Sequence, residues 1–170
     1  MIYFITGNKH KFTEAQAIIP ELKRLDLDLL EIQELDPRKI IEAKIPKYKT
    51  SIVVEDVSLE IEKLNGLPGP LVKWFIKTIG PKGIFNLAPD SNAQTIAMLG
   101  YKTKNTVHYF SGVTKGTIVA PRGKNGFGFD AIFQPTDSDK TFAQMSLAEK
   151  SRFSHRAKAF RKLKKFLQAL

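Results

Sequence analysis

The sequence has no cysteine, a shortage of acidic residues and no long apolar run. Without cysteine the fold cannot use disulfides, a thiolate nucleophile or a cysteine-ligated zinc site, and a cytoplasmic location is expected. No stretch approaches the roughly 18 apolar residues of a membrane span. The apolar start Met1–Ile5 is short and lacks the charged region of a signal peptide. We therefore expect an unprocessed protein without a membrane partner.

The charge is strongly basic, with 27 Lys and Arg against 17 Asp and Glu, a net charge of +10. This surplus predicts an anionic partner, which could be nucleic acid, a membrane surface or a phosphorylated small molecule. The 170 residues are 42% hydrophobic and 26% charged, which is typical of a folded chain. Length and composition together predict a single domain over residues 1–170.

Short β-branched runs alternate with helix-forming segments in the first part of the chain. We predict strands over 2–6, 25–32 and 51–55, with helices over 12–19 and 37–48 between them. A further helix is predicted over 71–79, after a Pro/Gly turn at 66–70. Two successive strand–helix units favour an α/β fold.

The second half predicts antiparallel strands followed by a helix. The strands are expected over 93–101, 106–110 and 117–119, with a hairpin centred near 112–116. One amphipathic helix is expected to begin at Ser146, because Ser146-Leu147-Ala148-Glu149 has the Ser-x-x-Glu pattern of a capping box. Apolar residues then recur every three or four positions.

The first candidate site is the polar segment Thr6-Gly7-Asn8-Lys9-His10-Lys11, between the first strand and the first helix. In open α/β sheets ligands bind at this junction, where helix N-termini attract anions. The segment has neither the spacing of a P-loop nor that of a dinucleotide-binding loop. Phosphate contact and an Asn-Gly turn with solvated lysines both remain open.

The second candidate is the pair Glu55-Asp56, at the end of the most apolar predicted strand. Successive side chains of a strand point to opposite faces, so only one of the two acids can point into a given site. Carboxylates suit Mg²⁺, and Glu31 could supply another oxygen ligand. A pair of surface acids is the alternative interpretation.

The third candidate is the glycine-rich segment 121–130, where Phe127 or Phe129 could stack on a nucleobase and Asp130 could accept hydrogen bonds from it. The same segment is similar to the core of an RNA-recognition motif. However, Asn125, Asp130 and Ile132 depart from that motif, and an acid beside the stacking surface would repel RNA phosphates. A hairpin with core phenylalanines is a further alternative.

The fourth candidate lies in the last predicted helix. Lys150 is in its first turns, where a basic side chain is unfavourable unless an anion compensates it, and His155 and Arg156 follow. A solvated basic helix face is the alternative. The three histidines show no metal-ligand spacing, so zinc is not expected.

Together these segments resemble the inosine triphosphatase family, also called the HAM1-like family of non-canonical purine NTP pyrophosphatases. The resemblance runs from the first strand to the last helix. It is carried by Thr6-Gly7-Asn8-Lys9-His10-Lys11 with Glu14, Glu31, Val54-Glu55-Asp56, Gly66-Leu67-Pro68-Gly69-Pro70, Phe127-Gly128-Phe129-Asp130, Ala148-Glu149-Lys150 and Ser154-His155-Arg156.

The resemblance implies an α/β fold with a mixed twisted sheet, flanking helices and two lobes around a central nucleotide cleft, related to the Maf-like fold. It implies Mg²⁺-dependent hydrolysis of ITP, dITP and XTP to the monophosphate and pyrophosphate, with Mn²⁺ as a substitute metal. This reaction would remove non-canonical purine nucleotides from the pool. A homodimer without a stable nucleic-acid partner is also implied.

The resemblance also implies roles for individual residues. Thr6, Asn8, Lys11 and Lys39 would contact the phosphates. Glu31 and Asp56 would hold the metal, and Asp56 would be the general base. The base would stack on Phe127 beside Gly128 and Phe129. The remaining contacts to the nucleotide would come from Asp130, Lys150, His155 and Arg156.

Two other functions remain open from the sequence. One is an RNA- or DNA-binding module that uses the Phe127/Phe129 surface and the basic C-terminal helix. The other keeps the fold but changes the substrate, as a Maf-like pyrophosphatase acting on modified pyrimidine nucleotides.

Overall fold

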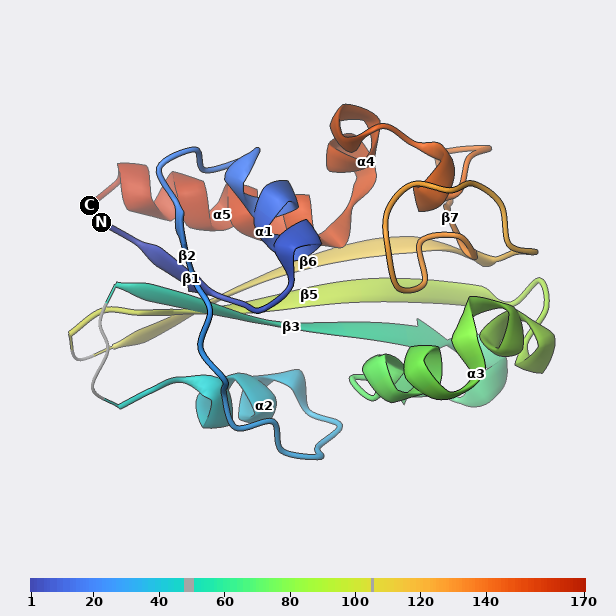
Figure 1. Cartoon of the computed structure of the whole chain (residues 1–170), viewed down its shortest axis with the longest axis horizontal. Helices are drawn as coiled ribbons and strands as arrows, with labels where there is room; N and C mark the ends of the chain where they lie inside the picture. The colour runs from blue at the N-terminus through green and yellow to red at the C-terminus, as the bar shows by residue number, and fades with distance from the viewer. Residues whose placement is uncertain (48–50, 105) are drawn as a thin grey trace.

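In the part of the chain that the structure describes, a seven-stranded mixed sheet runs through the molecule, with helices on both of its faces (Figure 1). The computed structural model describes residues 1–47, 51–104 and 106–170. The strands follow the order β2-β1-β3-β5-β6-β7, and β4 pairs with β3 off this path. The mixed sheet with flanking helices confirms the predicted fold class.

The elements have the following bounds. The strands are β1 (Tyr3–Ile5), β2 (Lys23–Leu25), β3 (Ile52–Ile61), β4 (Pro68–Gly69), β5 (Asn92–Lys102), β6 (Val107–Ile118) and β7 (Phe133–Pro135). The helices are α1 (Lys9–Gln16), α2 (Pro37–Lys44), α3 (Val72–Leu87), α4 (Leu147–Phe153) and α5 (His155–Gln168), with short 3₁₀ turns at Glu62–Leu64 and Phe142–Gln144.

Three long antiparallel strands, β3, β5 and β6, form the centre of the sheet. The short strands β1 and β2 are parallel to each other, and β1 is parallel to β3. Strand β3 is buried along nearly all of its length, which fits its run of Ile and Val side chains. This strand carries the two adjacent acids of the second candidate site.

Helices α1 and α5 lie on one face of the sheet, and α2 lies on the other (Figure 1). Glycines in β5 and β6 allow α2 and α5 to lie very close to the sheet. A Cβ at Gly112 of β6 would lie 2.0 Å from the carbonyl oxygen of His155 in α5, and one at Gly100 of β5 would lie 2.4 Å from Cγ2 of Ile41 in α2. The first residues of α5 are therefore held directly against β6.

Several predicted elements differ from the structure. The second strand covers only 23–25, because the rest of 25–32 forms no ladder hydrogen bonds. The predicted strands over 106–110 and 117–119 are parts of one continuous strand, β6, which pairs with β5 from Val107 to Thr117. The hairpin predicted at 112–116 is therefore wrong, and its glycines serve close packing instead. The last helix is two helices, because Ser154 leaves the helical conformation (ψ 142°) and caps α5.

Other elements are longer or shorter than predicted. Helix α1 begins at Lys9, because Asn8 caps it. Strand β3 extends to Ile61, and α3 continues past the kink at Gly80 to Leu87. Helix α2 ends at Lys44, whereas the predicted end at Tyr48 lies outside the described residues. Within the described ranges, none of the helices has the length and apolarity required to cross a bilayer.

Candidate functional site

The predicted site residues gather around an open edge of β3. Strand β1 pairs with β3 only at Ile52 and Val53, and β4 pairs with it only from Leu59 onwards. Between these points, the described residues supply no neighbouring strand on that side of 54–58. Side chains from both faces of the sheet can reach this opening.

The loop after β1 presents the N-terminus of α1 at the opening. The Asn8 side chain accepts a hydrogen bond from the Lys11 backbone N–H (3.1 Å), and the Thr6 hydroxyl accepts one from the Asn8 N–H (3.1 Å). The first turn of α1 contains no acid. The N-terminal dipole and the Lys11 ammonium together make this loop attractive to an anion.

Glu55 and Asp56 point to opposite faces of the sheet, as the alternation of a strand requires. Glu55 faces α5, where it binds Arg156, and its Oε2 also lies 3.1 Å from Lys11 Nζ. Asp56 faces α2 and accepts a hydrogen bond from Lys44 Nζ at 2.7 Å. The two acids therefore serve different parts of the site.

Lys44 brings Asp56 and Glu31 together. Its Nζ lies 3.8 Å from Glu31 Oε1 and also donates to the Glu55 carbonyl (3.3 Å). Glu31 lies in the irregular segment before α2, and its other oxygen accepts a hydrogen bond from Lys73 of α3 (2.6 Å). Two carboxylates and two ammonium groups thus converge from four separate segments.

Burial shifts the pKa of Asp56. Desolvation raises the pKa of this carboxyl, although Lys44 acts in the opposite direction. Its Oδ2 is buried without a hydrogen-bond partner among the described residues. A buried carboxylate with one free oxygen and a raised pKa is suited to accept a proton from water.

The other end of the site is a chain of alternating charges. Lys150 Nζ donates to Asp130 and to Glu14, both at 2.6 Å. Arg156 donates to Glu14 (2.6 Å) and, through two nitrogens, to Glu55 (2.7 and 3.1 Å). Burial alone would raise the pKa of Glu14 and Glu55, but the surrounding cations outweigh it and hold both below their usual value.

Phe127 lies above this charge chain, in the glycine-rich loop. Its backbone N–H donates to Asp130 (2.9 Å), and Lys150 Nζ lies 5.0 Å from its ring centroid. The half-buried ring also stacks on His10 of α1, with centroids 5.2 Å apart. Gly128 follows with φ 62°, a left-handed conformation that glycine adopts without strain.

Phe129 and His155 lie deeper than Phe127. Phe129 is buried, with its ring centroid 6.2 Å from that of Phe133 and 6.0 Å from that of His155. Both nitrogens of His155 are buried without a hydrogen-bond partner in the described part of the chain. Burial, reinforced by the neighbouring charge of Arg156, lowers the pKa of His155 well below 6.5, so its ring is neutral.

Three further residues of the site had no assigned role in the sequence prediction: Lys44, Lys73 and Glu14. Lys44 lies at the end of the same helix as Lys39, but the helix directs Lys44 inwards and Lys39 outwards. The Lys39 side chain is 61% exposed and pairs with Glu34 (3.3 Å). Its contact with phosphate stays a prediction. Lys44 follows Lys39 by five residues, and side chains at this spacing do not share a helix face. This spacing was the only sequence signal that Lys44 could point inwards while Lys39 points outwards.

The carboxylates of Glu31 and Asp56 fit a Mg²⁺ ion whose other ligands would be phosphate oxygens and water. The described residues contain no group of three or more His, Cys, Asp or Glu arranged to hold a metal. Glu31 and Asp56 do converge on one cation, Lys44, and Asp56 keeps a free oxygen. Mg²⁺ is commonly held by one or two carboxylates together with substrate phosphates and water, so this donor set is sufficient.

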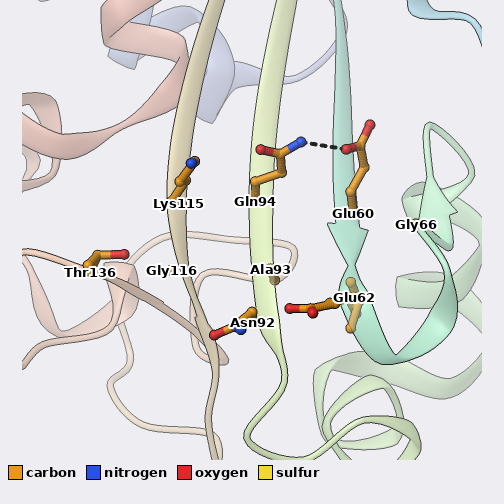
Figure 2. A pocket seen from close by; sticks show the side chains of 10 residues that line it. Glu60, Glu62, Gly66, Asn92, Ala93, Gln94, Lys115, Gly116 and Thr136 are labelled. Carbon is orange, nitrogen blue, oxygen red and sulfur yellow. Dashed lines mark hydrogen bonds between the residues drawn. The ribbon is translucent and has the colours of Figure 1, made fainter.

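A hollow of about 440 Å³ lies elsewhere, lined by the ends of β3, β5 and β6 (Figure 2). Gln94 donates to Glu60 across it (2.7 Å), and Lys115 and Thr136 stand further along its wall (Figure 2). None of the predicted site residues lines it.

The model of the Ham1 family matches residues 2–166. The chain is 39% identical over 180 residues to an inosine triphosphate pyrophosphatase of Schizosaccharomyces pombe, covering 99% of this chain and 95% of the relative. It is 40% identical over 174 residues to one of Pyricularia oryzae, with coverage of 95% and 90%.

Solved structures share the fold. The Ham1 protein of Staphylococcus aureus matches with a TM-score of 0.73 and 24% identity, over 99% of both chains. A HAM1 protein from Coxiella burnetii matches with a TM-score of 0.79 and 23% identity, over the whole of both chains.

Proposed function

Because this chain belongs to the Ham1 family, we propose that it is a nucleoside triphosphate pyrophosphatase that hydrolyses ITP, dITP and XTP to the monophosphate and pyrophosphate. The observation that carries the proposal is the gathering of three lysines around three carboxylates, beside a helix N-terminus. Lys11 pairs with Glu55, Lys44 with Asp56 and Lys73 with Glu31. A triphosphate carries about four negative charges, and its hydrolysis depends mainly on charge neutralisation and positioning.

In the proposed reaction Asp56 is the general base. It accepts a proton from a water molecule as the water oxygen bonds to the α-phosphorus, and the bond from that phosphorus to the α,β-bridging oxygen breaks. Pyrophosphate leaves, and the proton passes from Asp56 to solvent. The raised pKa of Asp56 brings its basicity closer to neutral pH, which favours proton transfer.

The phosphates are held by the chain at one end of the site. Thr6 and Asn8 fix the N-terminus of α1, and Lys11 has donors left after its contact with Glu55. Glu31 and Asp56 would hold Mg²⁺, with Mn²⁺ as a substitute. When bound, the metal supplies Lewis-acid polarisation and charge neutralisation at the phosphates.

The base is proposed to stack on Phe127 while Arg156 donates to its 6-oxo group. Arg156 has five N–H groups and gives three to Glu14 and Glu55, which leaves two. Adenine presents an amino group at this position, so a buried donor would be left unpaired and adenine disfavoured. Asp130, His155 and Lys150 complete this end, supported by Phe129 and Gly128.

The two alternatives have less support. Phe129 is buried and cannot stack on RNA, and Phe127 lies in a loop, not on a sheet face. Basic side chains of α5 already have partners within the protein, which weakens the nucleic-acid alternative. Lys158 and Lys162 donate to backbone carbonyls of β6, and Arg161 donates to Ser151. The match to the Ham1 model favours purine nucleotides over the modified pyrimidines of the Maf-like alternative.

The proposed pyrophosphatase also includes the two lobes around a nucleotide cleft, a homodimer and a cytoplasmic location.

The proposal is tested by measuring pyrophosphate release from ITP, XTP, GTP and ATP, with Mg²⁺ and with chelator. We expect turnover of ITP and XTP at least tenfold above ATP, and none with chelator. Equal turnover of all four would refute the base preference. Release of orthophosphate as the first product would place the attack at the γ-phosphorus and refute the reaction.

A further inference from the structure

Glu55 touches cations at both ends of the site. Its Oε2 is 3.1 Å from Lys11 Nζ, at the phosphate end, and 3.1 Å from a terminal nitrogen of Arg156, at the base end. Its Oε1 accepts from Arg156 Nε at 2.7 Å. The Glu55 side chain is only 1% exposed, so water cannot replace these contacts.

We propose that Glu55 is a positioning residue that couples recognition of the base to recognition of the triphosphate. This inference rests on the proposed function, because it assigns Arg156 to the base and Lys11 to the phosphates. Glu55 itself touches neither the substrate nor the reacting atoms. It fixes the guanidinium and the ammonium relative to each other, and thereby sets the span that a substrate must match.

The geometry of Arg156 supports this role. A two-nitrogen contact with one carboxylate fixes the plane of a guanidinium as well as its position. The Arg156 side chain is 2% exposed, and Glu14 holds its remaining terminal nitrogen at 2.6 Å. These contacts therefore fix the directions of the two remaining N–H groups of Arg156.

Glu14 is a suitable comparison for Glu55, because it contacts cations at only one end of the site. It binds Arg156 and Lys150, which are both assigned to the base end, and no ion pair joins it to Lys11 among the described residues. If Glu55 couples the two ends, disturbing Glu55 must affect both, whereas disturbing Glu14 must affect the base end alone.

The test uses Glu55→Asp and Glu14→Asp, which keep the charge but shorten the reach by one methylene. Glu60→Asp is the matched control, because Glu60 lies on the same strand and contacts Gln94 away from the site (Figure 2). Affinities are measured by calorimetry for inorganic tripolyphosphate and for the non-hydrolysable α,β-methylene analogues of ITP and ATP.

For Glu55→Asp we expect tripolyphosphate binding to weaken at least fivefold and the ITP/ATP affinity ratio to fall at least fivefold. For Glu14→Asp the ratio should fall while tripolyphosphate binding stays within twofold of wild type. For Glu60→Asp both should stay within twofold. A Glu55→Asp protein that changes only one of the two quantities, or neither, overturns the inference.

A second variant covers the case in which Glu55→Asp does not fold, as judged by circular dichroism. Lys11→Met removes a side chain that is 25% exposed and replaces it with a similar stem. Because Lys11 would act on Arg156 only through Glu55, we expect the ITP/ATP ratio to fall at least threefold. An unchanged ratio would overturn the coupling.

The binding measurements also separate this inference from the proposed function. If the wild type releases no pyrophosphate from ITP, the proposed function fails, but the coupling is still decided by the three affinities. If the wild type hydrolyses ITP and the Glu55 and Glu14 variants behave alike, the coupling fails and the proposed function stands.

Discussion

Glu55 and Asp56 are adjacent on β3, yet their side chains bind cations on opposite faces of the sheet. Glu55 binds Arg156 of α5, and Asp56 binds Lys44 of α2. Because β3 lacks a neighbouring strand on its β1 and β4 side along 54–58 within the described chain, both faces open into the same region. One strand thus supplies the proposed general base and the carboxylate that orients the base-binding arginine.

Asp56→Asn should abolish most of the activity. The amide keeps the shape of the side chain but cannot accept a proton from water, so we expect kcat for pyrophosphate release from ITP to fall by about 10² to 10⁴. Asp90→Asn is the control, because Asp90 is exposed and its φ of 55° suits asparagine. Activity of Asp56→Asn within tenfold of wild type would remove Asp56 from the mechanism.

Lys44→Met should cost far more stability than Lys39→Met. Lys44 and Asp56 are about 10% exposed, so removing the ammonium leaves a buried carboxylate without its partner, at a cost of about 3 kcal/mol. Lys39 pairs with Glu34 at the surface, where water screens the charges, so its loss should change stability little. Urea unfolding at pH 7 measures both.

The same two variants compare the candidates for phosphate contact. We expect Lys44→Met to reduce kcat/KM for ITP at least tenfold more than Lys39→Met. A larger loss of kcat/KM in Lys39→Met than in Lys44→Met would support contact between Lys39 and phosphate. Lys44 would then have a structural role only.

Phe127→Ala should weaken nucleotide binding without affecting the phosphate end. Stacking of a base on an aromatic ring contributes about 1–3 kcal/mol. KM for ITP should therefore rise by about 5- to 150-fold, while inhibition by tripolyphosphate should stay within twofold of wild type. Equal weakening of both would mean that the loop holds phosphate as well as base.

His155 should make the protein less stable in mild acid. The pKa of His155 is lowered well below 6.5 in the folded state, whereas the unfolded chain takes up a proton near 6.5. Below that pH only the unfolded state gains the proton. Folding is then disfavoured by up to about 1.4 kcal/mol per pH unit.

This effect is isolated by comparing the wild type with His155→Leu in urea unfolding at pH 5, 6, 7 and 8. The difference in free energy of unfolding between the two proteins should be constant above pH 7. It should shift against the wild type as the pH falls below 6.5. A difference that does not depend on pH would show that His155 takes up its proton as readily in the folded protein as in the unfolded chain.

Gly112→Ala should disturb both stability and substrate affinity. The new Cβ would lie 2.0 Å from the His155 carbonyl oxygen and 2.6 Å from the Ala159 nitrogen, so α5 must move away from β6. We expect a loss of about 2 kcal/mol and a raised KM for ITP, because His155 and Arg156 begin α5. Ser111→Ala, at the neighbouring position of β6, is the control. It should leave the stability unchanged and change KM for ITP by less than twofold.

The sequence alone determined the fold class, the family resemblance and most local features of the site. Asn8 caps α1 and Ser146 begins α4 through a capping box, because such contacts join residues only three positions apart. The opposite orientation of Glu55 and Asp56 also followed from the period of a strand.

Only the tertiary structure decided which cations meet which acids. Lys44 and Lys39 lie on one helix, and burial against β3 selects Lys44 to face Asp56. Gly112 looks like a turn residue in sequence, but close packing with α5 keeps it inside a strand. The pairing of Glu55 with Arg156 joins residues 101 positions apart. Local pattern cannot encode such contacts, because they depend on how distant elements pack.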